Sequence, residues 1–412
     1  MFDELIHELT NVSDFTASLH EYITHLSFNT VIVTIMMIFM IVGAVDKAQG
    51  NKRGYGQAFD QGFQAMGPLA ISMVGVIAAA PVLGMVFEPI VGPIYKAIGS
   101  SPAIFATTLL LADSGGYPLA VEMAGDDVAM GQFAGIIVGC TMGCILLFDI
   151  PVALTLINKK DRPLLACGIL VGVITAPVGC IVGGIVMSLT TEYHMAFGRM
   201  ICALLPVIIV AAILAVGLWF KPIALMNGFS KFGAFVTALI GIFVAIAVFQ
   251  YETGIRFPLF QLMVEPNSEG ISPLANSVEI LGDISFILIG AFPMVEWVKR
   301  HFGPLLAKIG KKIGLDETAS AGIVATIANN IPTFSMLKDM NPKGKLMNVA
   351  FASCAAFMFG DHLGFTAGVN STMILPMIFA KLACGLSALA LANILSPQLL
   401  AKAEHAVDDM AE

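Results

Sequence analysis

Hydrophobic runs long enough to cross a lipid bilayer dominate this 412-residue sequence. A membrane-spanning helix needs roughly 17–25 mostly apolar residues. Hydrophobic residues make up 57% of the chain and charged residues only 12%, about half the share found in soluble domains. We therefore expect an all-α integral membrane protein embedded in a lipid bilayer. Its eleven apolar runs lie near 28–45, 62–87, 102–122, 129–157, 162–188, 197–220, 227–250, 275–297, 318–337, 345–369 and 372–395.

The two ends of the chain differ from this apolar body. Residues 1–27 begin with acidic residues and lack the basic and apolar regions of a secretory signal. We expect them to form an amphipathic extension before a transmembrane transporter domain at 28–395. Residues 396–412 read as a polar C-terminal tail. The net charge of −8 gives no basic surface for nucleic acid, so we expect no nucleic-acid partner.

Two of the runs are interrupted by polar and helix-breaking residues. Segment 102–122 contains LADSGGYP at 111–118, and segment 318–337 contains IANNIP at 327–332. Proline removes a helical hydrogen bond, and paired glycines weaken a helix further. Main-chain groups freed at membrane depth must be buried in protein or line a watery cavity. We therefore predict two broken or re-entrant segments and about nine full transmembrane helices.

The charges of the loops agree with this prediction. Basic loops are retained on the cytoplasmic side of a membrane. If both interrupted segments turn back within the membrane, every basic cluster falls on one side. The acidic loops 123–128 and 251–274 then fall on the other side. This arrangement places the N-terminus outside and the C-terminus in the cytoplasm.

The interrupted segments occupy matching places in a predicted internal repeat. An odd number of spans separates the two repeat starts, so the halves, about 62–188 and 275–395, are predicted to be inverted relative to each other. In many transporters with inverted repeats, broken helices from both halves form the substrate site near the bilayer midplane. The sequence offset stays between 211 and 216 through three matches, which pair GPIYKAIG (92–99) with GPLLAKIG (303–310), LLLADSGGYP with ATIANNIP, and FDIP (148–151) with FGDH (359–362).

Ionisable side chains inside the apolar runs are the candidate site residues. Each costs on the order of 2.5–3.5 kcal/mol in the hydrocarbon region, so it needs a partner or a function. We expect no lysine or arginine at the same depth, which favours a site for a cation or a protonatable carboxyl. The primary substrate-binding candidates are Asp113, Ser114, Asn329, Asn330, Asp361 and His362, and the secondary candidates are Tyr117, Glu122, Asp149, Asp283 and Phe359.

Structural roles compete with each of these functional roles. Asp113 and Asn329 can cap interrupted helices as well as contact a substrate. His362 can form a structural hydrogen bond between helices or relay protons. Glu122 and Asp283 lie near segment ends, where the wall of a hydrated cavity is the favoured interpretation. The aromatic candidates can hold an ammonium over a ring face, although ordinary packing is the simpler role.

Enzyme and metal signatures are incomplete. DSGG at 113–116 resembles a serine-protease sequence, but this stretch is apolar on both sides and predicted to lie in the membrane. Gly360-Asp361 lacks the first glycine of the GxGD motif of intramembrane proteases, because Met358 stands there. The seven cysteines have neither CxxC nor zinc-site spacing. We expect no enzymatic activity, no cofactor and no metal.

Six motifs give the chain its family resemblance. From about Val33 to Ala390 it resembles the ethanolamine-utilisation transporter family, the permease encoded with bacterial ethanolamine-breakdown genes. The resemblance implies a multi-pass inner-membrane protein that imports ethanolamine. Three features differ from the pattern that we expect for this family. They are the N-terminal extension, Asp149 and Asp283. The motifs are FQAMGPLAISMVG (63–75), LADSGGYPLAVEMAGDDVA (111–129), IPVAL (150–154), GAFPMV (290–295), IANNIP (327–332) and GDHLGF (360–365).

The chemistry of ethanolamine suits the candidate residues. At neutral pH it carries an ammonium, which needs a carboxylate or a ring face, and one hydroxyl, which an amide can bind. We hypothesise that Asp113 or Asp361 holds the ammonium and that Asn329 or Asn330 holds the hydroxyl, with alternating access. The alternatives are a symporter of another small polar solute coupled to H⁺ or Na⁺, a facilitator of neutral ethanolamine, and a non-transport sensor or scaffold. The sequence leaves the oligomeric state open.

The predicted topology can be tested with reporter fusions. A reporter fused after Asp127 is expected on the outer face, and one fused after Lys160 in the cytoplasm, because only a re-entrant segment 102–122 places these two loops on those sides. Paired activities of a cytoplasmic and a periplasmic reporter measure both positions. Cytoplasmic activity of the fusion after Asp127 would contradict the re-entrant topology.

Overall fold

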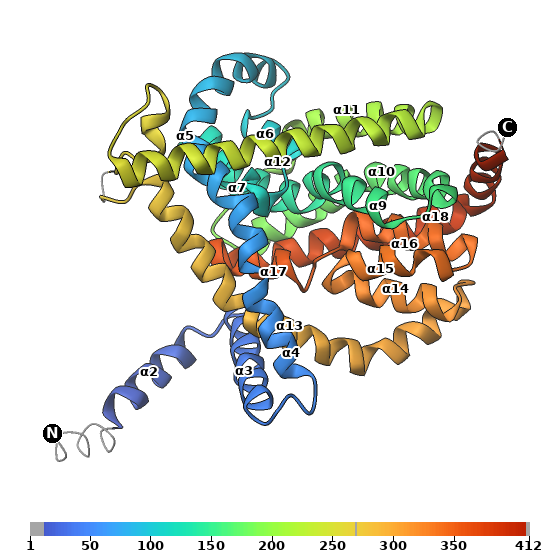
Figure 1. Cartoon of the computed structure of the whole chain (residues 1–412), viewed down its shortest axis with the longest axis horizontal. Helices are drawn as coiled ribbons and strands as arrows, with labels where there is room; N and C mark the ends of the chain where they lie inside the picture. Colours follow the sequence, from blue (N-terminus) through green and yellow to red (C-terminus); the bar gives the residue numbers. More distant parts are fainter. Residues whose placement is uncertain (1–11, 268–269, 409–412) are drawn as a thin grey trace.

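The computed structural model describes residues 12–267 and 270–408, and the regular elements in this part of the chain are all helical (Figure 1). Within the described residues, eight helical stretches are long and apolar enough to cross a membrane. The expected class, an all-α integral membrane protein, is therefore confirmed. The stretches are Phe28–Ala48, Tyr55–Ala97, Val128–Leu156, Lys159–Thr190, Phe197–Phe220, Pro222–Thr253, Pro273–Lys312 and Asp361–Ala406.

Several long helices begin where the sequence supplies a cap and a proline. Helix α13 (Pro273–Lys312) starts after Ser272, whose side chain accepts a hydrogen bond from the Ala275 N–H. Its proline occupies the first turn, where the missing N–H costs no hydrogen bond within the helix. The same first-turn proline is found in α10 (Arg162–Thr190), α12 (Pro222–Thr253) and α16 (Pro342–Ala355).

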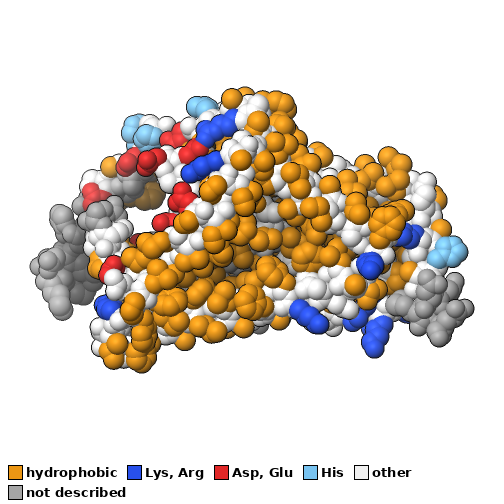
Figure 2. All heavy atoms as spheres, turned by 90° about the horizontal axis from the view of Figure 1, so that it is seen from above, with side chains coloured by type: hydrophobic (Ala, Val, Ile, Leu, Met, Phe, Trp, Pro, Cys, Tyr) orange, Lys and Arg blue, Asp and Glu red, His pale blue; other side chains and the backbone are white. Residues whose placement is uncertain are grey.

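The outer surface carries large apolar side chains that no protein covers. Ile213 and Phe220 of α11 (Phe197–Phe220) are 65% and 76% exposed, and Ile394 of α18 (Ile374–Asp408) is 69% exposed. Figure 2 shows hydrophobic side chains over most of one face of the molecule. Such a surface is stable only against an apolar solvent, which is what the lipid of a bilayer provides.

The two ends of the described chain are helical. Helix α2 (Ser13–Thr24) has no buried side chain and projects away from the bundle at the lower left of Figure 1. The rest of the expected extension, residues 1–11, lies outside the described residues. At the other end, α18 continues as one helix to Asp408, through most of the expected polar tail. Residues 409–412 are likewise outside the described part.

The first interrupted segment consists of three short helices after α5 (Met66–Ala97). They are α6 (Ala103–Leu109), η1 (Ala112–Ser114) and α7 (Gly116–Ala124). The seven residues of α6 span about 10 Å, against a hydrocarbon core of about 30 Å. Gly115 turns the chain with φ +88°, and a side chain there would overlap Val76. The break expected at 111–118 is confirmed.

The second interrupted segment breaks at a single residue. Helix α14 (Glu317–Ala328) ends before Asn329, which is extended, and α15 (Asn330–Met336) begins directly after it. The Asn329 side-chain oxygen accepts a hydrogen bond from the Ile331 N–H at 2.8 Å. The break expected at 327–332 is confirmed, and Asn329 has the capping role that was one of its two expected roles.

A third interruption was not expected. We predicted an uninterrupted span at 345–369, and this is wrong, because α16 ends at Ala355 and α17 (Asp361–Asn370) begins only at Asp361. Phe357 has φ +65° in between, a conformation that a helix cannot contain. The equivalent run of the first half, 129–157, stays continuous but is π-helical in η2 (Phe133–Gly143) and η3 (Ile145–Asp149).

The order of elements supports the predicted repeat. The motifs at 92–99 and 303–310 lie at or near the ends of α5 and α13, and a broken segment follows each of them. The long helices α10 and α18 then pack along each other. The inversion of the halves, the number of crossings and the sidedness stay predictions.

The close approach of two breaks can be tested at Gly360. A side chain at this position would overlap the carbonyl oxygen of Ala328. We expect Gly360→Ala to destabilise the protein by about 1–3 kcal/mol, as overpacking usually does. Thermal melting of the detergent-solubilised protein measures the effect. Gly241→Ala is the matched control, since a side chain at Gly241 meets nothing within 4 Å. Equal melting temperatures of the two variants would contradict the close approach.

Candidate functional site

A hydrogen bond inside the bundle joins the two halves of the chain. The amide nitrogen of Asn330, at the start of α15, donates to Oδ1 of Asp149, at the end of η3, over 2.5 Å. Both residues are 0% exposed. The Cys144 thiol lies 3.7 Å from the same carboxylate oxygen. Asp149, a secondary candidate from the sequence, therefore belongs to the buried site together with Asn330.

A second contact across the halves involves Asp113 and His362. The imidazole Nε2 of His362 lies 3.9 Å from Oδ2 of Asp113, within ion-pair range but too far for a hydrogen bond. Asp113 is 6% exposed and His362 is 0% exposed. Ser114 donates weakly to Asp113 over 3.4 Å, and the half-buried Asp361 interacts electrostatically with Asp113. Neither Asp113 nor Asp361 caps its helix through its side chain.

These residues, Asp113, Asp149, Asn330, Asp361 and His362, form what we call the polar cluster. Several of its buried polar atoms have no hydrogen-bond partner among the described residues. They are both ring nitrogens of His362, Oδ2 of Asp149 and Oδ1 of Asn330. Buried polar atoms in folded proteins are nearly always paired. The cluster therefore holds both donors and acceptors that a small polar molecule can engage.

A basic residue lies at the same depth, contrary to expectation. Lys381 of α18 is 0% exposed, so the prediction of no lysine among the intramembrane groups is wrong. Its Nζ donates to the carbonyl oxygen of Ala356 at 2.7 Å and to that of Cys354 at 3.4 Å. Lys381 also interacts electrostatically with Asp113 and Asp149. The signal was present in the sequence, as a single lysine in the middle of the run 372–395.

An amide and phenol network borders the cluster. Gln132 donates to the hydroxyl of Tyr117 at 3.1 Å, and Asn370 donates to Gln132 and to the hydroxyl of Tyr193, both at 3.0 Å. The Tyr117 ring also packs edge-on against Phe365 at 5.8 Å. The hydrogen bonds and the packing give Tyr117 a structural role. Gln132 and Tyr193 were not expected from the sequence, because only the fold brings them to Asn370.

Aromatic rings cover one side of the cluster. The Phe357 ring lies 5.3 Å from the His362 ring and packs edge-on against Phe148 at 5.2 Å. Phe359, the aromatic candidate in this stretch, is half-buried, and its main-chain N–H donates to the Ile327 carbonyl at 3.0 Å. Phe357 is therefore the ring beside the histidine, two residues before Phe359, the residue expected.

Two secondary candidates, Glu122 and Asp283, are exposed and lie outside the buried cluster. Glu122 lines a polar cleft of about 330 Å³ at the end of α7, which fits the expected hydrated wall. The cleft also contains an ion pair between Asp127 and Arg199. Asp283 lies on the exposed side of α13. The structure thus separates these two carboxylates from the other candidates.

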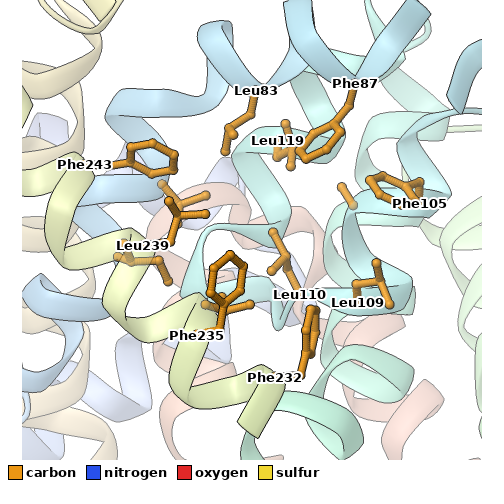
Figure 3. A pocket seen from close by; sticks show the side chains of 14 residues that line it. Leu83, Phe87, Phe105, Leu109, Leu110, Leu119, Phe232, Phe235, Leu239 and Phe243 are labelled. Carbon is orange, nitrogen blue, oxygen red and sulfur yellow. The ribbon is translucent and has the colours of Figure 1, made fainter. Parts of the chain in front are cut away.

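A second cavity near the first break is entirely apolar. It has a volume of about 250 Å³ and lies between α5, α6, α7 and α12 (Figure 3). Leu110 lines it, whereas the next residue, Leu111, packs with Ala356 and Phe357 beside the polar cluster. Its lining of leucine, valine, isoleucine, alanine and phenylalanine has no carboxylate to balance the charge of an ammonium and no polar side chain to bind a hydroxyl. The polar cluster is therefore the candidate site.

The fold and the cluster define a multi-pass helical membrane protein with a polar centre assembled from broken helices. The model of a family described as "Ethanolamine utilisation protein, EutH" matches residues 28–395. The chain belongs to this family. The family name and the names of the relatives point to a permease rather than an enzyme.

Curated relatives match nearly the whole chain. A protein of Listeria monocytogenes named "Probable ethanolamine permease EutH" is 47% identical over 388 residues, which cover 93% of this chain and 100% of the relative. A protein of Escherichia coli with the same name is 41% identical over 398 residues, covering 90% and 97%. The Bacillus subtilis protein named "Uncharacterized protein YxeR" is 40% identical over 382 residues, covering 93% and 99%. No solved structure matches the chain.

The hydrogen bond between Asp149 and Asn330 can be tested by exchanging its partners. Asn330→Asp places two carboxyl groups face to face, and we expect a loss of about 1–3 kcal/mol from one unsatisfied buried carboxyl. Adding Asp149→Asn to that variant re-forms the pair in reverse and should restore most of the stability. Thermal melting of the solubilised proteins measures both changes. The contact is disproved if the double variant melts no higher than Asn330→Asp alone.

Proposed function

We propose that this chain imports ethanolamine across a bacterial inner membrane. Family membership supports the proposal, since two relatives are named as probable ethanolamine permeases. The observation that carries it is the charge of the buried cluster. Asp113, Asp149 and Asp361 supply three carboxyl groups, whereas in the described part of the chain Lys381 is the one ammonium that interacts with Asp113 and Asp149, and none is found to interact with Asp361. This acidic excess favours a cationic substrate over an anionic or neutral one.

The contacts of the cluster suggest how each end of ethanolamine is held. Its ammonium would lie between Asp113 and Asp361, two carboxylates that interact electrostatically, because an ammonium needs charged or aromatic partners. Its hydroxyl would donate to Oδ1 of Asn330, which has no partner otherwise. Asn329 is the poorer choice, because its oxygen already accepts from the Ile331 N–H.

Closure of the cluster supports transport by alternating access. Asp149, Asn330 and His362 are 0% exposed, so a solute can reach them only after the surrounding helices move. The hydrogen bond between Asp149 and Asn330 and the contact between Asp113 and His362 both join opposite halves. Rocking of one half against the other would open these contacts to one side at a time.

The polar cleft at Glu122 suits the outer approach to this site. It lies at the end of α7, the helix that begins directly after the Asp113 turn. Its loop, 123–128, is on the outer side in the predicted topology, with the N-terminus outside and the C-terminus in the cytoplasm. Glu88 is paired with Lys96 and Asp127 with Arg199, so Glu122 gives the cleft its acidic excess, which would raise the local concentration of a cation before it enters.

The proposed ammonium contacts can be tested by uptake into proteoliposomes. Asp113→Asn and Asp361→Asn are each expected to lower uptake of labelled ethanolamine at limiting concentration by roughly tenfold or more, because a hydrogen bond to a charged group contributes about 1.5–3 kcal/mol. Glu252→Gln is the control, since this exposed carboxylate lies at the end of α12, away from the cluster. Wild-type uptake by both variants would overturn the proposed ammonium site.

The same assay separates an ammonium carrier from a pore for neutral ethanolamine. A pore needs no ammonium site, so its uptake would rise with external pH as the neutral amine becomes more abundant, and Asp113→Asn would leave it unchanged. Uptake by an ammonium carrier is not expected to rise with external pH in this way, and Asp113→Asn is expected to lower it.

A further inference from the structure

The buried ammonium of Lys381 has no role in the proposed contacts with the substrate. It lies in the second turn of α18 and is 0% exposed, although lysine is among the residues least often fully buried. A charged group at this depth needs partners or a function. Its direct partners are two main-chain carbonyl groups, those of Cys354 and Ala356.

These carbonyl groups belong to the broken C-terminal end of α16. The last carbonyls of a helix have no helical N–H partners and form the negative end of its dipole. Here the helix stops at Ala355, inside the membrane domain, because the segment 356–360 is not helical. Carbonyl oxygens at such a break, with Asp113 and Asp149 in electrostatic range of the same point, make a position that attracts a cation.

In transporters with broken helices, a position of this kind coordinates the coupling Na⁺. In this chain the ammonium of Lys381 fills it, held at 2.7 Å from the Ala356 oxygen. We propose that Lys381 is a built-in cation that replaces a coupling Na⁺ at the end of α16, so that transport by this chain does not require Na⁺. The transport part of this inference rests on the proposed function, whereas the cation position does not.

The proposal makes a specific prediction for variants of Lys381. Removing the side chain with Lys381→Ala leaves the carbonyl groups and the acidic residues without their cation, in a space that a small ion can fill. Na⁺ should then bind, and binding to the folded state raises the melting temperature by mass action. Lys381→Met removes the charge but fills most of the space, so this matched variant should not respond to Na⁺.

Thermal melting of the solubilised proteins in NaCl and in N-methyl-D-glucamine chloride tests the cation position without any substrate. We expect Na⁺ to stabilise Lys381→Ala and to leave the wild type and Lys381→Met unchanged. Equal responses of Lys381→Ala and the wild type would overturn the proposal. If Lys381→Ala does not fold, Lys381→Met decides, because its melting in N-methyl-D-glucamine chloride at the wild-type temperature would show that the cation is not needed.

Uptake measurements test the consequence for transport. Wild-type proteoliposomes should take up labelled ethanolamine equally with Na⁺ or N-methyl-D-glucamine outside, and Lys381→Met should lose roughly tenfold or more, as expected for the loss of charge-assisted hydrogen bonds. Wild-type uptake that depends on Na⁺ would overturn the proposal. Absence of ethanolamine uptake by the wild type would contradict the proposed function instead, and the melting experiment would still stand.

Discussion

The main chain of one break pairs with the main chain of another in the C-terminal half. Phe357 and Phe359 donate their N–H groups to the carbonyl oxygens of Thr326 and Ile327, at 3.3 and 3.0 Å. Peptide groups left unpaired in hydrocarbon would cost several kcal/mol each, so neither break is stable without a partner. Because Gly360 lies directly against Ala328, the paired breaks fix where α17 begins. The positions of Asp361 and His362 depend on this pairing.

At the break 356–360, the negative end of the α16 dipole and the positive end of the α17 dipole both face the site. The C-terminal carbonyls of α16 meet the ammonium of Lys381, and Asp361 stands in the first turn of α17. Each charge therefore lies at the helix end that favours its sign. A single interruption thus positions a cation and an anion within the same buried region. This helps explain how so many ionisable groups can be buried together.

The sequence predicted the two interruptions that arise from local chemistry. Gly115 in its left-handed turn and Asn329 at its helix cap are residue types that end helices wherever they occur. The break after Ala355 depends instead on hydrogen bonds to Thr326 and Ile327, and its own residues are mostly apolar. No local pattern could therefore indicate it. The partners of Lys381 are hidden for the same reason, since main-chain carbonyls leave no signature in a sequence.

Synthesis order gives the bond between Asp149 and Asn330 a consequence for assembly. The two residues are 181 positions apart, and Lys381 follows later still. Helices made first enter the membrane first, so the carboxyl groups of the first half are inserted before any of these partners exists. The first half alone cannot pair Asp149 with Asn330 or Asp113 with His362, so the bundle becomes stable only when its last helices arrive. The inserted helices therefore fold cooperatively, in a step that the C-terminal half completes.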